Sequence, residues 1–168
     1  MARLSVVIPV ALAVIFMILF LTFRSIRQAA AVFVTIPLAL TGGVLGLFVT
    51  QNYLSVPASV GFIALLGIAV LNGVVMVSYF NELVKTMPLK EAVIEGAKRR
   101  LRPVVMTALI AAFGLVPMLF ATGPGSEIQK PLAIVVIFGL ISSTLLTLLI
   151  LPILYRRIEL KQAAAVEK

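Results

Sequence analysis

Five long apolar runs, separated by short polar segments, make up most of the chain. They cover approximately residues 4–23, 29–49, 60–80, 103–121 and 131–155. Each run contains about 20 residues, and a helix of that length, which rises about 1.5 Å per residue, crosses a hydrocarbon core of about 30 Å. The pattern therefore predicts an all-α membrane protein whose fold is a bundle of five transmembrane helices.

The hydrophilic stretch between the third and fourth runs, residues 81–102, has a helical pattern of its own. Pro88 suits the first position of a helix. The glutamates that follow come early and the lysine and arginines come late, as the helix dipole favours. We expect a short surface helix over approximately residues 88–100, and a polar tail over residues 160–168 after the last apolar run.

The first apolar run also has the general character of a cleavable signal peptide. Only one basic residue, Arg3, precedes the run, and the run is longer than the hydrophobic part of a signal peptide. No pair of small residues suited to cleavage follows before the next apolar segment. We therefore interpret residues 4–23 as a transmembrane helix.

The composition excludes a soluble protein and several kinds of chemistry. With 62% hydrophobic residues and a mean hydropathy of +1.20, the chain has more apolar surface than one soluble core of 168 residues can bury. It contains no Cys, His or Asp, which removes disulfides and the usual ligands of transition metals. A zinc-protease HExxH motif and a Gly-rich phosphate loop are also absent. We expect no enzymatic activity, no metal site and no cofactor.

The net charge of +8 comes from basic residues that flank the apolar runs, which indicates membrane orientation rather than nucleic-acid binding. If five helices alternate across the membrane, all but two of the 14 Lys and Arg residues, Arg3 and Lys130, fall on one side. Cytoplasmic flanks are the basic ones. The N-terminus is thus predicted to be periplasmic, and the C-terminus, the surface helix and the tail cytoplasmic. A periplasmic N-terminus also suggests that the chain is a piece of a longer protein.

The predicted spans contain no acidic or basic side chain, because every glutamate, lysine and arginine falls in a loop, an end or the tail. Proton-driven carriers use intramembrane carboxylates or lysines, so the chain alone is not expected to drive transport. Two polar residues stand out within the runs. Asn72 either hydrogen-bonds a neighbouring helix or lines a transport path, and Thr107 either bonds its own backbone or lines the same path.

Small and flexible side chains also recur within the runs. We predict that six glycines let helices pack closely: Gly42, Gly43, Gly61, Gly67, Gly73 and Gly114. Three methionines, Met76, Met106 and Met118, either fill gaps in the packing or offer sulfur to a soft monovalent metal ion. We favour the packing interpretation for both sets.

Four sequence segments together carry a family resemblance. They are IPLALTGG (36–43), VGFIALLGIAVLNGVVMVSYFNEL (60–83), EAVIEGAKRRLRPVVMTALIAAFGLVPM (91–118) and ATGPGSEIQKPLA (121–133). In order and spacing they resemble the last five membrane spans of resistance-nodulation-division (RND) efflux pumps. The resemblance extends to about Glu159. It is closest to the heavy-metal branch of the cobalt-zinc-cadmium type, because drug exporters have a lysine before the asparagine, where this chain has Leu71.

This resemblance implies a heavy-metal cation/proton antiporter of the bacterial inner membrane. It also implies a homotrimer that works with a periplasmic adaptor and an outer-membrane channel. Asn72 and Thr107 would be neutral hydrogen-bonding partners in a proton relay. The carboxylates of that relay would lie in an N-terminal half of the pump that this chain lacks.

Three alternatives remain at this point. The chain could belong to an RND exporter of drugs or other hydrophobic compounds, which Leu71 argues against. It could be an accessory membrane subunit of protein export from the same superfamily, although that unit has six spans and the ATGPGSEIQKPLA loop does not fit it. It could also be a small structural membrane protein, in which case the serial motifs would be coincidental.

Overall fold

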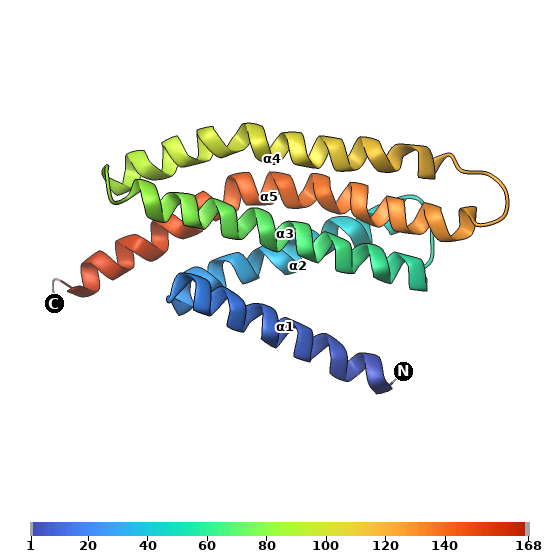
Figure 1. The fold of residues 1–168 in the computed structure, drawn as a ribbon, viewed down its shortest axis with the longest axis horizontal. Coiled ribbons are helices and arrows are strands. Elements are labelled where there is room, and N and C mark those ends of the chain that lie inside the picture. Colours follow the sequence, from blue (N-terminus) through green and yellow to red (C-terminus); the bar gives the residue numbers. More distant parts are fainter. Residues whose placement is uncertain (1, 167–168) are drawn as a thin grey trace.

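The computed structural model describes residues 2–166, with side chains described for residues 9–160. The chain forms five helices, and the described residues contain no β-strand (Figure 1). The helices are α1 (Ala2–Phe23), α2 (Ile26–Val49), α3 (Val56–Leu83), α4 (Leu89–Leu119) and α5 (Ser126–Val166). The predicted all-α membrane fold is confirmed.

Four of the helices are long and apolar enough to cross a membrane: α2, α3, α4 and the part of α5 from Ser126 to Leu160. Helix α1 has 22 residues, but its described apolar stretch, Pro9–Phe23, is shorter. The remaining side chains of the predicted first span lie outside the described residues. A membrane crossing by α1 therefore stays a prediction.

The predicted surface helix over residues 88–100 is not a separate element. It forms the N-terminal part of α4, which continues without a break through Pro103 into the predicted fourth span. A proline inside a membrane helix removes one hydrogen bond but is tolerated when local adjustment satisfies the freed carbonyl. Likewise, the described part of the predicted tail, residues 160–166, continues α5, while residues 167–168 lie outside the described residues.

The turns between helices follow local backbone chemistry. In the loop between α4 and α5, Gly123 and Gly125 adopt φ angles of 106° and 93°, which favour glycine. Helix α5 begins directly after Gly125, at Ser126, five residues earlier than the predicted start at Pro131. At the start of α3, the Ser55 hydroxyl accepts a hydrogen bond from the backbone N–H of Ala58 at 3.4 Å.

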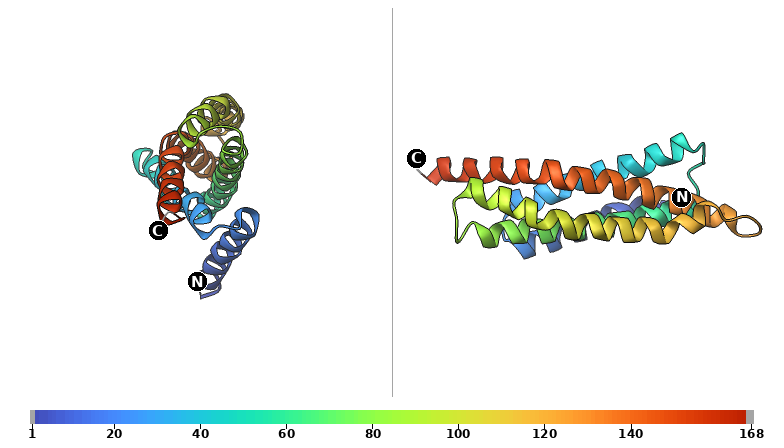
Figure 2. Two further views of the ribbon diagram at one scale, coloured as in Figure 1. Left: turned by 90° about the vertical axis from the view of Figure 1, so that its left-hand side faces the viewer. Right: turned by 90° about the horizontal axis from the view of Figure 1, so that it is seen from above.

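Helix α5 is the centre of the bundle and packs against α2, α3 and α4. Helix α1 packs mainly on α2 and diverges from the other helices towards the N-terminus (Figures 1 and 2). The α1–α2 turn, the α3–α4 turn and the C-terminal part of α5 lie at the same end of the bundle. We call this the basic end, because the lysines and arginines that flank the helices gather there.

Burial is uneven among the helices. In the most apolar stretch of α5, 50% of the residues are buried, whereas only 6% are buried in that of α4. The main core lies near the basic end, where the rings of Phe80 and Tyr155 stand 5.1 Å apart beside Met76 and Leu151. Helix α4 thus presents an apolar face that the other described helices do not cover.

Candidate functional site: a polar pocket between α3 and α4

Asn72 and Thr107 line the same pocket, although they are 35 positions apart in the sequence. The pocket has a volume of about 210 Å³ and lies between α3 and α4. Its lining is Leu71, Asn72, Val75, Met76, Arg100, Pro103, Val104 and Thr107. The packing of the two helices therefore joins the two polar residues that the sequence singles out.

The side chain of Asn72 is buried, with 9% of its surface exposed. Among the described residues, the Asn72 side chain makes no hydrogen bond. Buried amides are nearly always hydrogen-bonded in folded proteins. This amide therefore remains able to bond a group that faces the pocket.

Thr107 is exposed on α4, and its hydroxyl donates to the backbone carbonyl of Pro103 at 2.9 Å. This is the local backbone bond that threonines in membrane helices commonly form. The bond uses the hydroxyl proton but leaves the oxygen free to accept. Thr107 can thus offer an acceptor to the pocket without losing its contact to the helix.

Arg100 is the one charged residue of the pocket lining, and the sequence analysis assigned it only to the basic surface. Its guanidinium stacks over the ring of Tyr79, 4.6 Å from the centroid, a cation–π contact. The one ion pair among the described residues joins its neighbour Arg99 to Glu95 at 2.7 Å. Arg100 and Thr107 are seven residues apart, so they share a face of α4, and this spacing was the signal that could have linked them.

Leu71 and Met76 differ in their environments. Leu71 lies at the pocket with 60% of its surface exposed, while Met76 is fully buried in the main core. The burial of Met76 supports the gap-filling interpretation for this residue. No group of three or more His, Cys, Asp or Glu side chains in the described part of the chain is placed to hold a metal ion.

Four of the six singled-out glycines lie in tight helix contacts. A Cβ on Gly42 would meet the Cβ of Ser142 and lie 2.9 Å from the carbonyl oxygen of Phe138. The others that leave no room for a Cβ, or barely any, are Gly43, Gly61 and Gly73. By contrast, Gly67 and Gly114 are exposed, and within the described chain nothing would lie within 4 Å of a Cβ on either. A packing role for these two glycines stays a prediction, since no described helix comes close to them.

A second polar cluster, which the sequence analysis missed, joins α2, α3 and α5 at the basic end. The amide nitrogen of Gln28 donates to Asn81 Oδ1 at 3.0 Å and to Glu159 Oε1 at 2.8 Å, and the Asn81 amide donates back to Gln28 Oε1 at 2.9 Å. The hydroxyl of Tyr155 also donates to Asn81 Oδ1, at 2.6 Å. Asn81 is therefore the shared member of the cluster.

The cluster predicts a stability effect at Asn81. Asn81→Ala leaves groups of Gln28 and Tyr155 without partners, so we expect the free energy of unfolding in detergent to fall by about 1–3 kcal/mol. Asn52→Ala is the matched control, because the Asn52 amide bonds only Thr50 in its own loop, and it should change stability by less than about 0.5 kcal/mol. Equal losses in both variants would contradict a clamping role.

Comparison with known proteins adds sequence relatives. The sequence profile of the AcrB/AcrD/AcrF family matches residues 1–159. The chain is 56% identical over 155 residues to the cobalt-zinc-cadmium resistance protein CzcA of Cupriavidus metallidurans, which covers 92% of this chain. It is 57% identical over 155 residues to protein HelA of Legionella pneumophila (91% of this chain), and 37% identical over 166 residues to the cation efflux system protein CusA of Escherichia coli strain K12 (92%).

A solved structure agrees with these relatives. The crystal structure of a heavy metal efflux pump, crystal form II, superposes with a TM-score of 0.86 at 47% sequence identity, covering 94% of this chain. The chain spans only 15% of CzcA, 15% of HelA, 16% of CusA and 16% of the crystallised pump. The pocket therefore lies in a bundle that corresponds to a small part of each of these longer proteins.

Proposed function

The chain belongs to the AcrB/AcrD/AcrF family, and on that premise we propose that it is the C-terminal transmembrane part of a heavy-metal cation efflux pump driven by protons. The observation that carries the proposal is the meeting of Asn72, Thr107 and Arg100 in one pocket. Two neutral hydrogen-bonding groups and a cation, held at the edge of a membrane bundle, form an environment suited to a carboxylate. The chain itself is a multi-pass protein of the inner membrane.

In this proposal the proton binds outside the chain, on a carboxylate that faces the pocket. When ionised, this carboxylate pairs with Arg100 and accepts a hydrogen bond from Asn72. When protonated, it loses the ion pair, and the contact between its helix and α4 weakens. Binding and release of the proton would thus change the packing of two parts of the pump, which couples the proton gradient to transport.

The face of α4 that no described helix covers is suited to packing against another helix. On α4, Ile110 and Phe113 each have 70% of their surface exposed, and Gly114 on the same helix and Gly67 on α3 are open to close approach. Glycines at the surface of a membrane helix let another helix come near. We therefore assign this face to the N-terminal half of the same pump, which also supplies the titrating carboxylate.

The orientation and assembly follow from the same proposal. The basic end faces the cytoplasm and the N-terminus the periplasm, as the distribution of Lys and Arg favours. The intact pump would be a homotrimer that works with a periplasmic adaptor and an outer-membrane channel. Cobalt, zinc and cadmium are the cations named for CzcA, and they are the candidate substrates here.

A drug-exporting RND pump is the second candidate function. Leu71 separates the two, because its apolar side chain stands at the pocket where a drug exporter would carry a lysine. In the present chain the pocket cation comes from α4 instead, through Arg100. An accessory subunit of protein export is less consistent with relatives that are named for metal resistance and cation efflux.

Transport by a chimera tests the proposal. If this chain replaces the matching segment of CzcA, cells that are sensitive to cobalt, zinc and cadmium should regain resistance, and a protonophore should abolish efflux. The chain alone, reconstituted in proteoliposomes with an imposed pH gradient, should show no cation flux, because its predicted spans hold no carboxylate, lysine or histidine. Cation flux through the chain alone, or efflux from the chimera that continues in the presence of the protonophore, would refute the proposal.

A further inference from the structure

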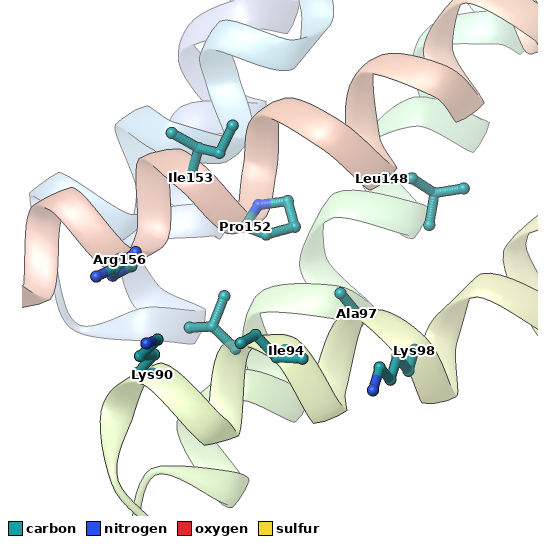
Figure 3. A pocket seen from close by; sticks show the side chains of 9 residues that line it. Lys90, Ile94, Ala97, Lys98, Leu148, Pro152, Ile153 and Arg156 are labelled. Atoms are coloured by element: carbon teal, nitrogen blue, oxygen red, sulfur yellow. The ribbon is translucent and has the colours of Figure 1, made fainter.

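A groove with an apolar floor and a basic rim lies between α4 and α5 at the basic end (Figure 3). Its volume is about 360 Å³. The floor is formed by Val93, Ile94 and Ala97 of α4 and by Leu148, Pro152 and Ile153 of α5. Three cations line it as well: Lys90, Lys98 and Arg156. The groove shares no residue with the pocket around Asn72.

The charge of this groove is of one sign. Lys90 and Arg156 lie near one end, on opposite helices, and Lys98 lies about two turns along α4 (Figure 3). No acidic residue lines the groove, and the one ion pair among the described residues belongs to Arg99 and Glu95. Like charges brought together repel, so this arrangement favours an anionic ligand.

The position of the groove also fits a lipid. Arg156 directly follows the predicted fifth span, which places it at the level of the phospholipid headgroups. Leu148 and Ile153 come before it, inside the predicted fifth span, and Ile153 has 58% of its surface exposed. A molecule that is anionic at one end and apolar along its length matches both parts of the groove at once.

We propose that this groove binds an anionic phospholipid. Its phosphate lies between Lys90 and Arg156 at one end of the groove, Lys98 adds positive charge further along α4, and an acyl chain runs over the floor between α4 and α5. Basic pockets between membrane helices on the cytoplasmic side are suited to such headgroups. The lipid would hold α4, which is the least buried membrane helix, against the central helix α5. This function is independent of transport.

Lipid titration of the purified full chain in detergent, followed by native mass spectrometry, tests the proposal. The probes are phosphatidylglycerol, cardiolipin and zwitterionic phosphatidylethanolamine. The groove variant Lys90→Gln/Lys98→Gln/Arg156→Gln should lose about a hundredfold in affinity for the two anionic lipids. The control variant Lys85→Gln/Arg102→Gln/Arg157→Gln removes three charges from exposed positions outside the groove and should stay within about twofold of the parent chain.

Each other outcome overturns the proposal. Equal losses in the two triple variants would mean that net charge alone attracts the lipid. Equal affinity for anionic and zwitterionic lipids would remove the role of the cations. Full displacement of the lipid by millimolar inorganic phosphate would identify a free-phosphate site. Ala97→Phe, which fills the floor and keeps every charge, should also lose at least about tenfold, and undiminished binding would show that no acyl chain enters the groove.

Discussion

Gly42→Ala is expected to lower the free energy of unfolding of the chain by about 1–3 kcal/mol, because it forces α2 and α5 apart. The new methyl group would meet the Cβ of Ser142 and lie 2.9 Å from the backbone carbonyl oxygen of Phe138. A backbone oxygen cannot rotate away as the end of a side chain can, so the helices themselves must shift. Unfolding of purified protein in detergent, followed by circular dichroism, measures the change.

Gly67→Ala is the matched control for this prediction. It makes the same chemical change in a neighbouring membrane helix, but no described atom lies within 4 Å of the new Cβ. Alanine is the better helix former by up to about 1 kcal/mol, so this variant should be as stable as the parent chain or more stable. If both variants lost the same stability, contact between α2 and α5 would not be the cause.

The architecture was largely predictable from the sequence because membrane helices have a strong signal. A run of about 20 apolar residues has few alternatives to a helix in lipid, where every backbone group must be satisfied within the segment. The continuity of α4 was not predictable in the same way. Pro103 and the change from charged to apolar residues resemble a helix boundary, but α4 runs through both without a break.

The candidate site was predictable only as separate residues. Asn72 and Thr107 stood out because polar side chains are rare in apolar runs, but the packing of α3 on α4 places them in one pocket. Arg100 looked like one of several surface charges that set orientation. Its role in the pocket depends on which face of α4 turns towards α3. This orientation cannot be deduced from the local sequence.

The polar cluster at the basic end could not be predicted from the sequence either. Gln28 and Glu159 are 131 positions apart, and each lies at the end of an apolar run, where a polar residue needs no explanation. Comparison with known proteins identifies the family, which these polar residues alone do not. The resemblance to heavy-metal RND pumps rested on several motifs in series, and it is confirmed by the family match and by relatives such as CzcA.

Arg100→Gln is expected to reduce proton-coupled cation efflux more than about a hundredfold in the CzcA chimera, to the level of cells without a pump. The variant leaves the proposed carboxylate without its counter-charge in a partly buried site, and breaking such a pair costs about 3–5 kcal/mol. Asn72→Ala removes one hydrogen bond to the same carboxylate and should lower efflux by roughly five- to thirtyfold. Thr107→Val should have a smaller effect, since the hydroxyl already bonds Pro103.

Arg99→Gln and Asn52→Ala are the matched controls for these variants. Arg99 is an exposed neighbour of Arg100 that pairs with Glu95 on the surface, and Asn52 lies in the α2–α3 loop. Both variants should keep efflux within about twofold of the parent chimera, since exposed changes of this kind cost little. Arg100→Lys separates charge from stacking: it keeps the cation but loses the planar contact with Tyr79, so it should retain part of the activity. Normal efflux in Asn72→Ala, at equal expression, would leave Asn72 with a packing role alone, because a residue that bonds the titrating group cannot be lost without changing how readily that group binds its proton.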